Sequence, residues 1–217
     1  MYKLKPFKHS SHDKIINLVP PNARVLDVGC ASGYLASFLK LKNCHVTGVD
    51  NNPEYILEAK NYCDSVILLD ITKEDLEGIY DVIILGDLIE HTPNPELVLL
   101  KLRKNLPKWG VIIVSVPNIA NVYARTKIIL GNFDYEDKGI FDKTHLRFFT
   151  IKTLKNLLKN TGYKVDSISF TPLPVHLKFP KANKNLLNSS SSMLHSLANL
   201  WPTLFTYQII IKARKLE

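Results

Sequence analysis

Short apolar runs alternate with segments of helical periodicity along most of the chain. Nearly continuous apolar runs are typical of parallel strands that are covered on both faces. We expect such strands at residues 24–28, 44–50, 66–69, 80–85 and 111–116. Helical patterns lie between and before them, at residues 10–18, 34–41, from Pro53 onward and at 96–106. This alternation predicts a doubly wound α/β fold.

The last of these helical patterns, residues 96–106, is amphipathic, and we count Leu97, Leu100 and Leu102 among its apolar positions. The regular alternation ends after residue 117. Residues 118–149 contain aromatic, arginine and turn residues with little periodicity. A segment of this length within a compact domain is usually functional or partly helical.

A further helix is expected at residues 151–160, with Thr150 as its cap and Gly162 as its end. Two more strands are expected at residues 163–170 and 205–212.

An insertion at residues 173–204 separates these last two strands. It is rich in proline and serine, and we expect it to hold one helix with an apolar stripe at Met193, Leu194, Leu197, Leu200 and Trp201. Packing against the sheet is the simplest role for this stripe. The alternatives are a lid over an acceptor site, the face of a homodimer, or peripheral contact with a membrane surface.

The composition indicates one globular domain over residues 1–217, large enough to bury roughly 70% of the unfolded chain's surface. No apolar run approaches the roughly 18 residues that a membrane span needs, and the basic N-terminus lacks the apolar core of a signal peptide. Cys30, Cys44 and Cys63 have no metal-ligand spacing, so a reduced, cytoplasmic location is expected.

The formal net charge is +8. Such a charge suits an anionic partner, such as nucleic acid, a nucleotide-linked sugar or a membrane surface. The lysines are scattered rather than clustered, which favours a solvated surface instead.

The first predicted strand runs into a turn that contains Gly29, Ala31 and Gly33 and then into a helix. The spacing is one residue shorter than the dinucleotide-binding pattern. Asp27 stands just before the turn, where a negative charge suits a ligand with an amine rather than a phosphate. At the middle position we expect Ala31 to adopt a negative φ, because only glycine takes positive values freely.

This turn resembles the first motif of class I S-adenosylmethionine-dependent methyltransferases, with alanine in place of the middle glycine. The resemblance implies a seven-stranded, mostly parallel, Rossmann-like sheet with insertions after the fifth strand and between the sixth and seventh. It also implies S-adenosylmethionine as methyl donor and S-adenosylhomocysteine as product. The cofactor-binding candidates are Asp27, Gly29, Cys30, Ala31, Gly33, Tyr34, Asp50, Asn51, Asp70, Ile71 and Asp87.

Two of these candidates follow predicted strands. Asp50 ends the second strand, where a carboxylate can accept from both hydroxyls of a ribose; its alternative role is a helix cap before Pro53. Asp70 follows the third strand and can accept from the adenine amino group, although an aspartate at a strand end is common.

Asp87, Glu90 and His91 follow the fourth strand in a D-x-x-E-H pattern. The pattern resembles an element of several methyltransferase families, including the quinone-biosynthesis O-methyltransferases, some of which use it to hold a divalent metal. His145 is the candidate for a fourth ligand. A helix-entry element without metal is favoured over this reading. His145 is alternatively a general base or a packed structural residue.

Residues 144–150, Thr-His-Leu-Arg-Phe-Phe-Thr, and the segments before them resemble a methyltransferase subgroup associated with bacterial surface-glycan biosynthesis. The resemblance implies a glycan hydroxyl as acceptor. Substrate-binding candidates in this region are Asn118, Arg125, Tyr135 and Arg147. Structural pairing of the arginines with Asp134 or Asp142 is equally compatible with the sequence.

The main functional hypothesis is methyl transfer to a hydroxyl of a small molecule or glycan, with His145, His91 and Glu90 as catalytic candidates. A nucleic-acid methyltransferase is an alternative suggested by the charge, but the chain lacks a basic stripe and the Asn/Asp-Pro-Pro-Tyr element. A third alternative is a non-catalytic subunit that binds the donor. The three catalytic candidates argue against it.

Overall fold

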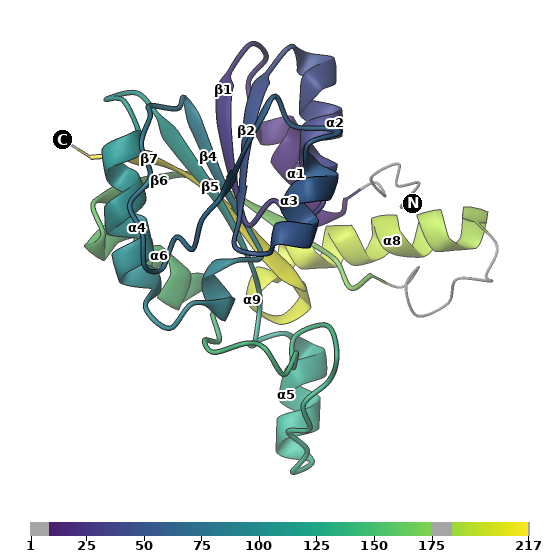
Figure 1. Ribbon diagram of the computed structural model, residues 1–217. Coiled ribbons are helices and arrows are strands. Elements are labelled where there is room, and N and C mark those ends of the chain that lie inside the picture. Colours follow the sequence, from purple (N-terminus) through teal and green to yellow (C-terminus); the bar gives the residue numbers. More distant parts are fainter. Residues whose placement is uncertain (1–8, 175–183, 217) are drawn as a thin grey trace.

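The computed structural model describes residues 9–174 and 184–216, with side chains from residue 192 onward in the second range. Seven strands form one sheet in the order β3-β2-β1-β4-β5-β7-β6 (Figure 1). Only β7 runs antiparallel to its neighbours β5 and β6. The expected doubly wound, mostly parallel sheet is confirmed. The strands are β1 (Arg24–Val28), β2 (His45–Asp50), β3 (Ser65–Leu68), β4 (Val82–Gly86), β5 (Val111–Pro117), β6 (Tyr163–Thr171) and β7 (Gln208–Lys215).

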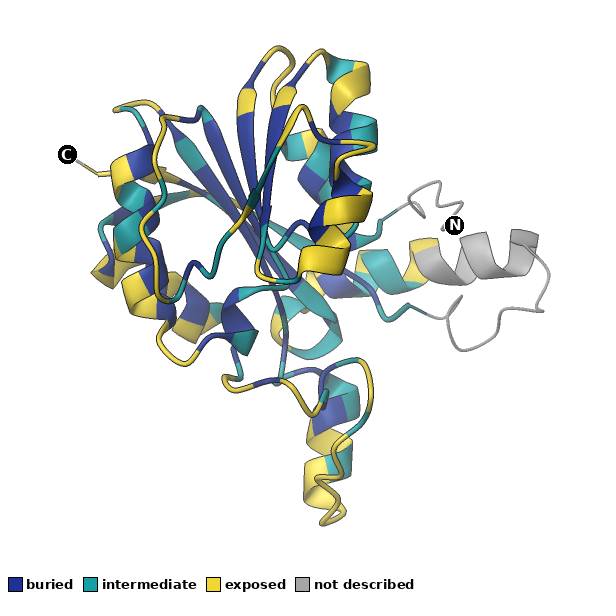
Figure 2. Ribbon diagram, in the orientation of Figure 1, coloured by how far each residue is buried: buried dark blue, intermediate teal, exposed yellow. Residues whose placement is uncertain are grey.

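Helices cover both faces of the sheet, and the apolar strand residues alternate between two cores. Val25 of β1 packs in one core with residues of α1, α2 and α3. The next residue, Leu26, packs in the other core with residues of α4 and α6. Figure 2 shows the buried sheet between exposed helix surfaces. The helices are α1 (Ser11–Leu18), α2 (Tyr34–Leu39), α3 (Pro53–Ala59), α4 (Pro95–Leu102), α5 (Val122–Ile129), α6 (Ile151–Asn160), α8 (Lys184–Leu200) and α9 (Pro202–Phe205).

Local capping explains why two helices begin where the sequence predicts. The Thr150 hydroxyl accepts from the backbone N–H of Thr153 at 3.2 Å, and the Thr153 hydroxyl accepts from the N–H of Thr150 at 2.8 Å. This reciprocal capping box fixes the start of α6. Pro53 begins α3, as expected, but the cap is Asn52 rather than Asp50.

Two elements differ by three residues or more from the sequence-based expectation. Helix α4 ends at Leu102, and its exposed side chains include Leu97 and Leu100, at 43% and 49%. Val98, Leu99 and Leu102 face the sheet instead, because only one apolar stripe of this leucine-rich helix can point inward. Strand β7 begins three residues later than expected, since Pro202 opens α9.

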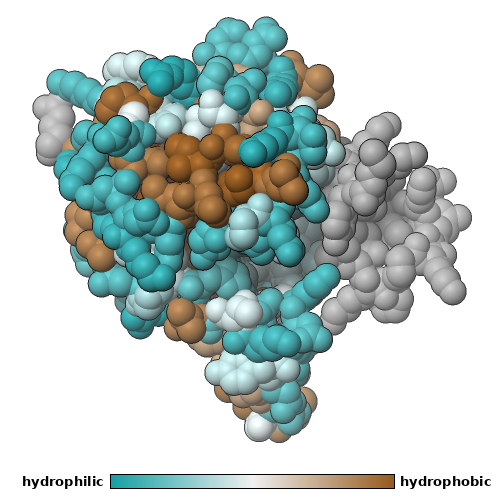
Figure 3. All heavy atoms as spheres, in the orientation of Figure 1, coloured by the Kyte–Doolittle hydropathy of each residue, from teal (hydrophilic) through white to brown (hydrophobic). Residues whose placement is uncertain are grey.

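The connection from β3 to β4, residues 69–81, crosses the sheet face in turns rather than as a helix. An apolar band is visible on the face between α3 and α4 (Figure 3). Exposed apolar side chains on the bounding elements include Leu68 at 55% and Ile79 at 49%. With turns in place of a helix, the connection leaves apolar side chains exposed on this face.

The 118–149 segment contains α5, which projects from the body of the molecule (Figure 1). Its base is anchored by a small core of Ala124, Ile140 and Phe141. In the later insertion, Leu194 and Leu197 are half-buried, whereas Met193, Leu200 and Trp201 are exposed. The predicted apolar stripe therefore packs only in part. None of the described helices combines the length and apolar character that a membrane crossing requires.

Candidate active site

The turn after β1 places backbone with little or no side chain at the carboxyl end of the sheet. Gly29 and Gly33 have φ values of 76° and 78°, which favour glycine. The N–H groups of Gly29 and Cys30 donate to the Val49 carbonyl, at 2.7 and 3.0 Å. A Cβ on Gly33 would lie 3.1 Å from the Ala59 Cα, so this glycine is also required by the close approach of α3.

Ala31 has a φ of 45°, so the expectation of a negative φ was wrong. Its backbone N–H donates to Asp50 Oδ2 at 3.0 Å. The second oxygen of Asp50 accepts from the N–H of Asn52 at 2.9 Å. The strained alanine is therefore held in place by a carboxylate at the end of β2.

Asp27 is 2% exposed, and its Oδ2 has no hydrogen-bond partner within the described structure. Burial, with a smaller contribution from the charge of Asp50, raises the pKa of Asp27 to about 7. An unpartnered buried carboxylate oxygen is costly unless a ligand satisfies it. The ammonium group of a ligand would meet this requirement.

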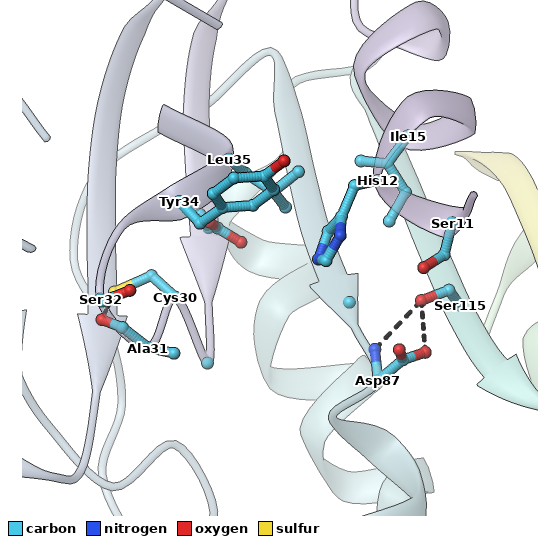
Figure 4. A pocket seen from close by; sticks show the side chains of 13 residues that line it. Ser11, His12, Ile15, Cys30, Ala31, Ser32, Tyr34, Leu35, Asp87 and Ser115 are labelled. Atoms are coloured by element: carbon cyan, nitrogen blue, oxygen red, sulfur yellow. Dashed lines mark hydrogen bonds between the residues drawn. The ribbon is translucent and has the colours of Figure 1, made fainter. Parts of the chain in front are cut away.

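A hollow of about 390 Å³ opens beside this turn (Figure 4). Cofactor candidates from the sequence that line it are Asp27, Gly29, Cys30, Ala31, Tyr34 and Asp87. Sequence reasoning missed the remaining lining residues: Ser11, His12, Ile15, Ser32, Leu35, Gly86 and Ser115. The three from α1 belong to no motif, and only the packing of α1 over the pocket identifies them.

Five further cofactor candidates do not line the hollow. Gly33 supports the turn, and Asp50 reaches the hollow only through its bond to Ala31. Asn51 is exposed and Ile71 is buried in the core beside α4. Asp70 accepts from the Thr72 hydroxyl at 2.6 Å and pairs with Lys73 at 2.9 Å. These bonds lower the pKa of Asp70.

Asp87, which follows β4, is hydrogen-bonded to side chains of β5 and β7 and does not belong to the metal cluster. Its Oδ1 accepts from the Ser115 hydroxyl at 2.7 Å, and its Oδ2 accepts from Gln208 Nε2 at 2.6 Å. The expected four-residue set of Asp87, Glu90, His91 and His145 is therefore only partly assembled, because both Asp87 oxygens are bound to β5 and β7.

Glu90, His91 and His145 do come together, with potential ligand atoms within 4.8 Å of one another. Glu90 is 1% exposed, and both carboxylate oxygens lack a hydrogen-bond partner in the described structure. Burial, helped by the charge of Asp87, raises the pKa of Glu90 well above its ordinary value. The two oxygens need either a proton or a cation.

Backbone hydrogen bonds position His145 beside Glu90. The Glu90 carbonyl accepts from the N–H groups of Leu146 and Arg147, at 2.8 and 3.0 Å. His145 Nδ1 lies 3.1 Å from the Ile140 carbonyl oxygen, which can only accept, so Nδ1 carries the hydrogen. The neutral ring thus has an unprotonated Nε2, and burial lowers the pKa of His145 and favours this neutral form.

His91 lies across from His145, with ring centroids 4.8 Å apart. Its Nδ1 is 3.0 Å from the Thr144 hydroxyl and 3.2 Å from the Thr144 carbonyl oxygen. Thr144 therefore fixes the orientation of the His91 ring.

The four substrate-binding candidates differ in how far their polar groups are already engaged. Asn118 is fully buried, and its amide nitrogen donates to the carbonyls of Thr203 and Thr206, so it has no hydrogen left for an acceptor. Arg125 donates to the Ala120 carbonyl at 2.7 Å, and Arg147 to the Pro93 carbonyl at 2.6 Å. Neither arginine pairs with Asp134 or Asp142 in the described structure. Tyr135 is 63% exposed.

The chain is similar to characterised methyltransferases. The (S)-tetrahydroprotoberberine N-methyltransferase of Eschscholzia californica is 42% identical over 102 residues, 42% of this chain and 29% of that protein. The ubiquinone biosynthesis O-methyltransferase of Pectobacterium carotovorum is 26% identical over 178 residues, 76% of this chain and 74% of that protein. The chain thus spans less than a third of the length of the first relative.

Solved structures with the same fold cover nearly the whole chain. A SAM-dependent methyltransferase from Archaeoglobus fulgidus has a TM-score of 0.65 at 20% identity, covering 93% of this chain and 90% of that one. Magnesium protoporphyrin IX methyltransferase from Synechocystis, with bound SAH, has a TM-score of 0.63 at 17% identity, covering 94% and 81%. A family model described as a methyltransferase domain matches residues 9–168. The chain therefore belongs to the methyltransferase domain family and has the fold of class I S-adenosylmethionine-dependent methyltransferases.

Proposed function

We propose that this protein transfers a methyl group from S-adenosylmethionine to a hydroxyl of a small molecule or glycan. The observation that carries the proposal is the buried, unpartnered Oδ2 of Asp27 at the wall of a hollow within a methyltransferase fold. The oxygen suits the ammonium group of the donor. Gly29 and Ala31 present backbone without bulky side chains beside it.

The acceptor chemistry requires a base, because a hydroxyl must lose its proton during transfer. His145 supplies an unprotonated Nε2, and its lowered pKa favours the neutral ring at neutral pH. The acceptor oxygen bonds to the methyl carbon as the carbon–sulfur bond breaks, and the proton goes to His145 Nε2. S-adenosylhomocysteine is the second product.

The wider coverage of one relative supports a hydroxyl over an amine. The Pectobacterium relative, an O-methyltransferase, matches 76% of this chain, whereas the N-methyltransferase match covers 42%. The glycan part of the proposal rests on the resemblance of residues 144–150 to the surface-glycan subgroup. A cytoplasmic location, a homodimer and a membrane contact by residues 173–204 remain predictions.

Metal-assisted O-methylation is a second candidate, favoured by the cluster of Glu90, His91 and His145. The two unpartnered Glu90 oxygens and the His145 Nε2 are ligand types that divalent ions accept. A bound ion would lower the pKa of a coordinated acceptor hydroxyl. Asp87 would not contribute, because Ser115 and Gln208 hold its oxygens.

The experiment that tests the proposal supplies S-adenosylmethionine with paired acceptors that differ only in a hydroxyl or an amine, and detects methylated product by mass spectrometry. We expect transfer to the hydroxyl member. Transfer to the amine alone would contradict O-methylation, and no transfer from a protein that binds the donor would favour the non-catalytic subunit.

A further inference from the structure

The amino-acid end of S-adenosylmethionine carries two opposite charges. Asp27 and Asp87, the acidic residues that line the hollow, suit the ammonium group and repel the carboxylate. A carboxylate that leaves water needs a hydrogen-bond donor, preferably one with positive charge. The hollow must therefore offer a second group besides Asp27.

His12 is the residue lining the hollow, within the described structure, that can carry a positive charge. It lies in the first turn of α1, and Ser11 and Ile15 of the same helix also line the hollow. Figure 4 shows its imidazole ring directed into the hollow from α1, between Tyr34 and Asp87.

The surroundings of His12 leave its ring nitrogens available. The ring meets Tyr34 edge to face, with centroids 4.9 Å apart, and no hydrogen bond to either nitrogen occurs in the described structure. Asp87, the residue after β4, is the acid whose charge acts on the ring. Asp13 of α1 is engaged elsewhere: its carboxylate accepts from the backbone N–H of His9, and its own backbone N–H donates to the Ser10 hydroxyl. Burial lowers the pKa of His12, and the charge of Asp87 opposes this effect. The neutral ring still offers one N–H to a carboxylate, and a bound carboxylate favours the protonated ring.

We propose that His12 binds the carboxylate of the donor, so that Asp27 and His12 together recognise both charges of its amino-acid end. This inference rests on the proposed function, because it assumes S-adenosylmethionine as donor. His12 is a positioning residue: it holds the end of the donor that does not react. Two opposite contacts fix the direction of the amino-acid chain and therefore the position of the sulfonium that carries the methyl group.

The test compares three ligands by calorimetry: S-adenosylhomocysteine, its decarboxylated analogue, and 5′-methylthioadenosine, which lacks the amino-acid end. The proteins are wild type, His12→Ala, Asp27→Asn and the control His45→Ala, which removes an exposed histidine outside the hollow. His12→Ala should weaken S-adenosylhomocysteine about tenfold to a hundredfold and leave the decarboxylated analogue unchanged. Asp27→Asn should weaken both amine-bearing ligands.

A His12→Lys variant should recover part of the preference for the carboxylate, since it restores the charge. The inference is overturned if His12→Ala weakens the two amine-bearing ligands equally, which indicates a structural role, or weakens neither. If wild type binds none of the three ligands, the proposed function itself fails. If His12→Ala binds all three ligands as tightly as wild type but turns over more slowly, His12 acts on the acceptor side, and the inference is also overturned.

Discussion

The backbone N–H of Ala31 donates to the carboxylate of Asp50 across 3.0 Å, which links the turn after β1 to the end of β2. Ala31 has a φ of 45°, which is unfavourable for a residue with a Cβ. The bond explains how an alanine occupies the middle of this glycine turn. It also means that Asp50 supports the wall of the pocket whether or not it touches a ribose.

Replacing Ala31 with glycine should stabilise the protein slightly. The change removes left-handed strain of about 1–2 kcal/mol and adds about 0.5–1 kcal/mol of unfolded-state entropy. We expect the free energy of unfolding to rise by about 0.5 kcal/mol in a urea titration. The control Ala36→Gly, in the buried part of α2, should lower it by about 1 kcal/mol. A loss of stability in Ala31→Gly would contradict the strain.

Gly33 and Gly131 form a matched pair for testing the close packing of the turn. Their φ values are 78° and 79°, but a Cβ on Gly33 would meet the Ala59 backbone at 3.1 Å, whereas one on Gly131 would meet nothing within 4 Å. Gly131→Ala should lower the free energy of unfolding by about 1 kcal/mol, because of the left-handed conformation alone. Gly33→Ala should lower it by about 2 kcal/mol more, because the added Cβ overpacks against α3. Equal losses in chemical denaturation would refute a packing role for Gly33.

The raised pKa of Asp27 predicts how donor affinity depends on pH. Asp27 must be ionised to bind an ammonium group, and its pKa is about 7 in the free protein. Affinity should therefore increase as the pH rises toward 7, by at most about tenfold per pH unit, and level off above it. Calorimetry in the His12→Ala background isolates this effect from titration of the histidine. The dependence should disappear when Asp27→Asn is added, and its persistence would assign it to another group.

The same pKa has the opposite effect on the stability of the donor-free protein. Between about pH 4 and pH 7 the folded protein holds a proton on Asp27 that the unfolded chain has released. The contribution of Asp27 to the free energy of unfolding therefore falls as the pH rises through this range. Urea titrations of wild type and Asp27→Asn should diverge there, with the wild type losing more stability. Parallel curves would show that Asp27 ionises as easily in the folded state as in the unfolded chain.

His145 and a chelator separate the two candidate mechanisms. If His145 is the base, His145→Gln should lower kcat by about a hundredfold or more, donor affinity should stay within about twofold, and EDTA should have no effect. Glu90→Gln keeps the shape of the buried side chain and should lower kcat less than His145→Gln. Loss of turnover on chelation, with recovery on adding a divalent ion, would favour the metal-assisted alternative.

The parts of the molecule that can be predicted from the sequence are those whose structure depends on neighbouring residues. The strand, turn and helix around Gly29 and Gly33 follow from neighbouring residues, as does α6 with its Thr150 cap. The geometry of Ala31 depends on Asp50, 19 residues away. The separation of Asp87 from Glu90 depends on Gln208, 121 residues away. Such partners become visible only once the sheet order is known.

Donor recognition is the central claim, and calorimetric titration of the wild-type protein and Asp27→Asn with S-adenosylhomocysteine tests it most directly. The account predicts one binding event in the wild type and an affinity about tenfold to a hundredfold lower in Asp27→Asn, because the ammonium group loses its charged partner. No binding to the wild type, or equal affinity in the two proteins, would contradict it.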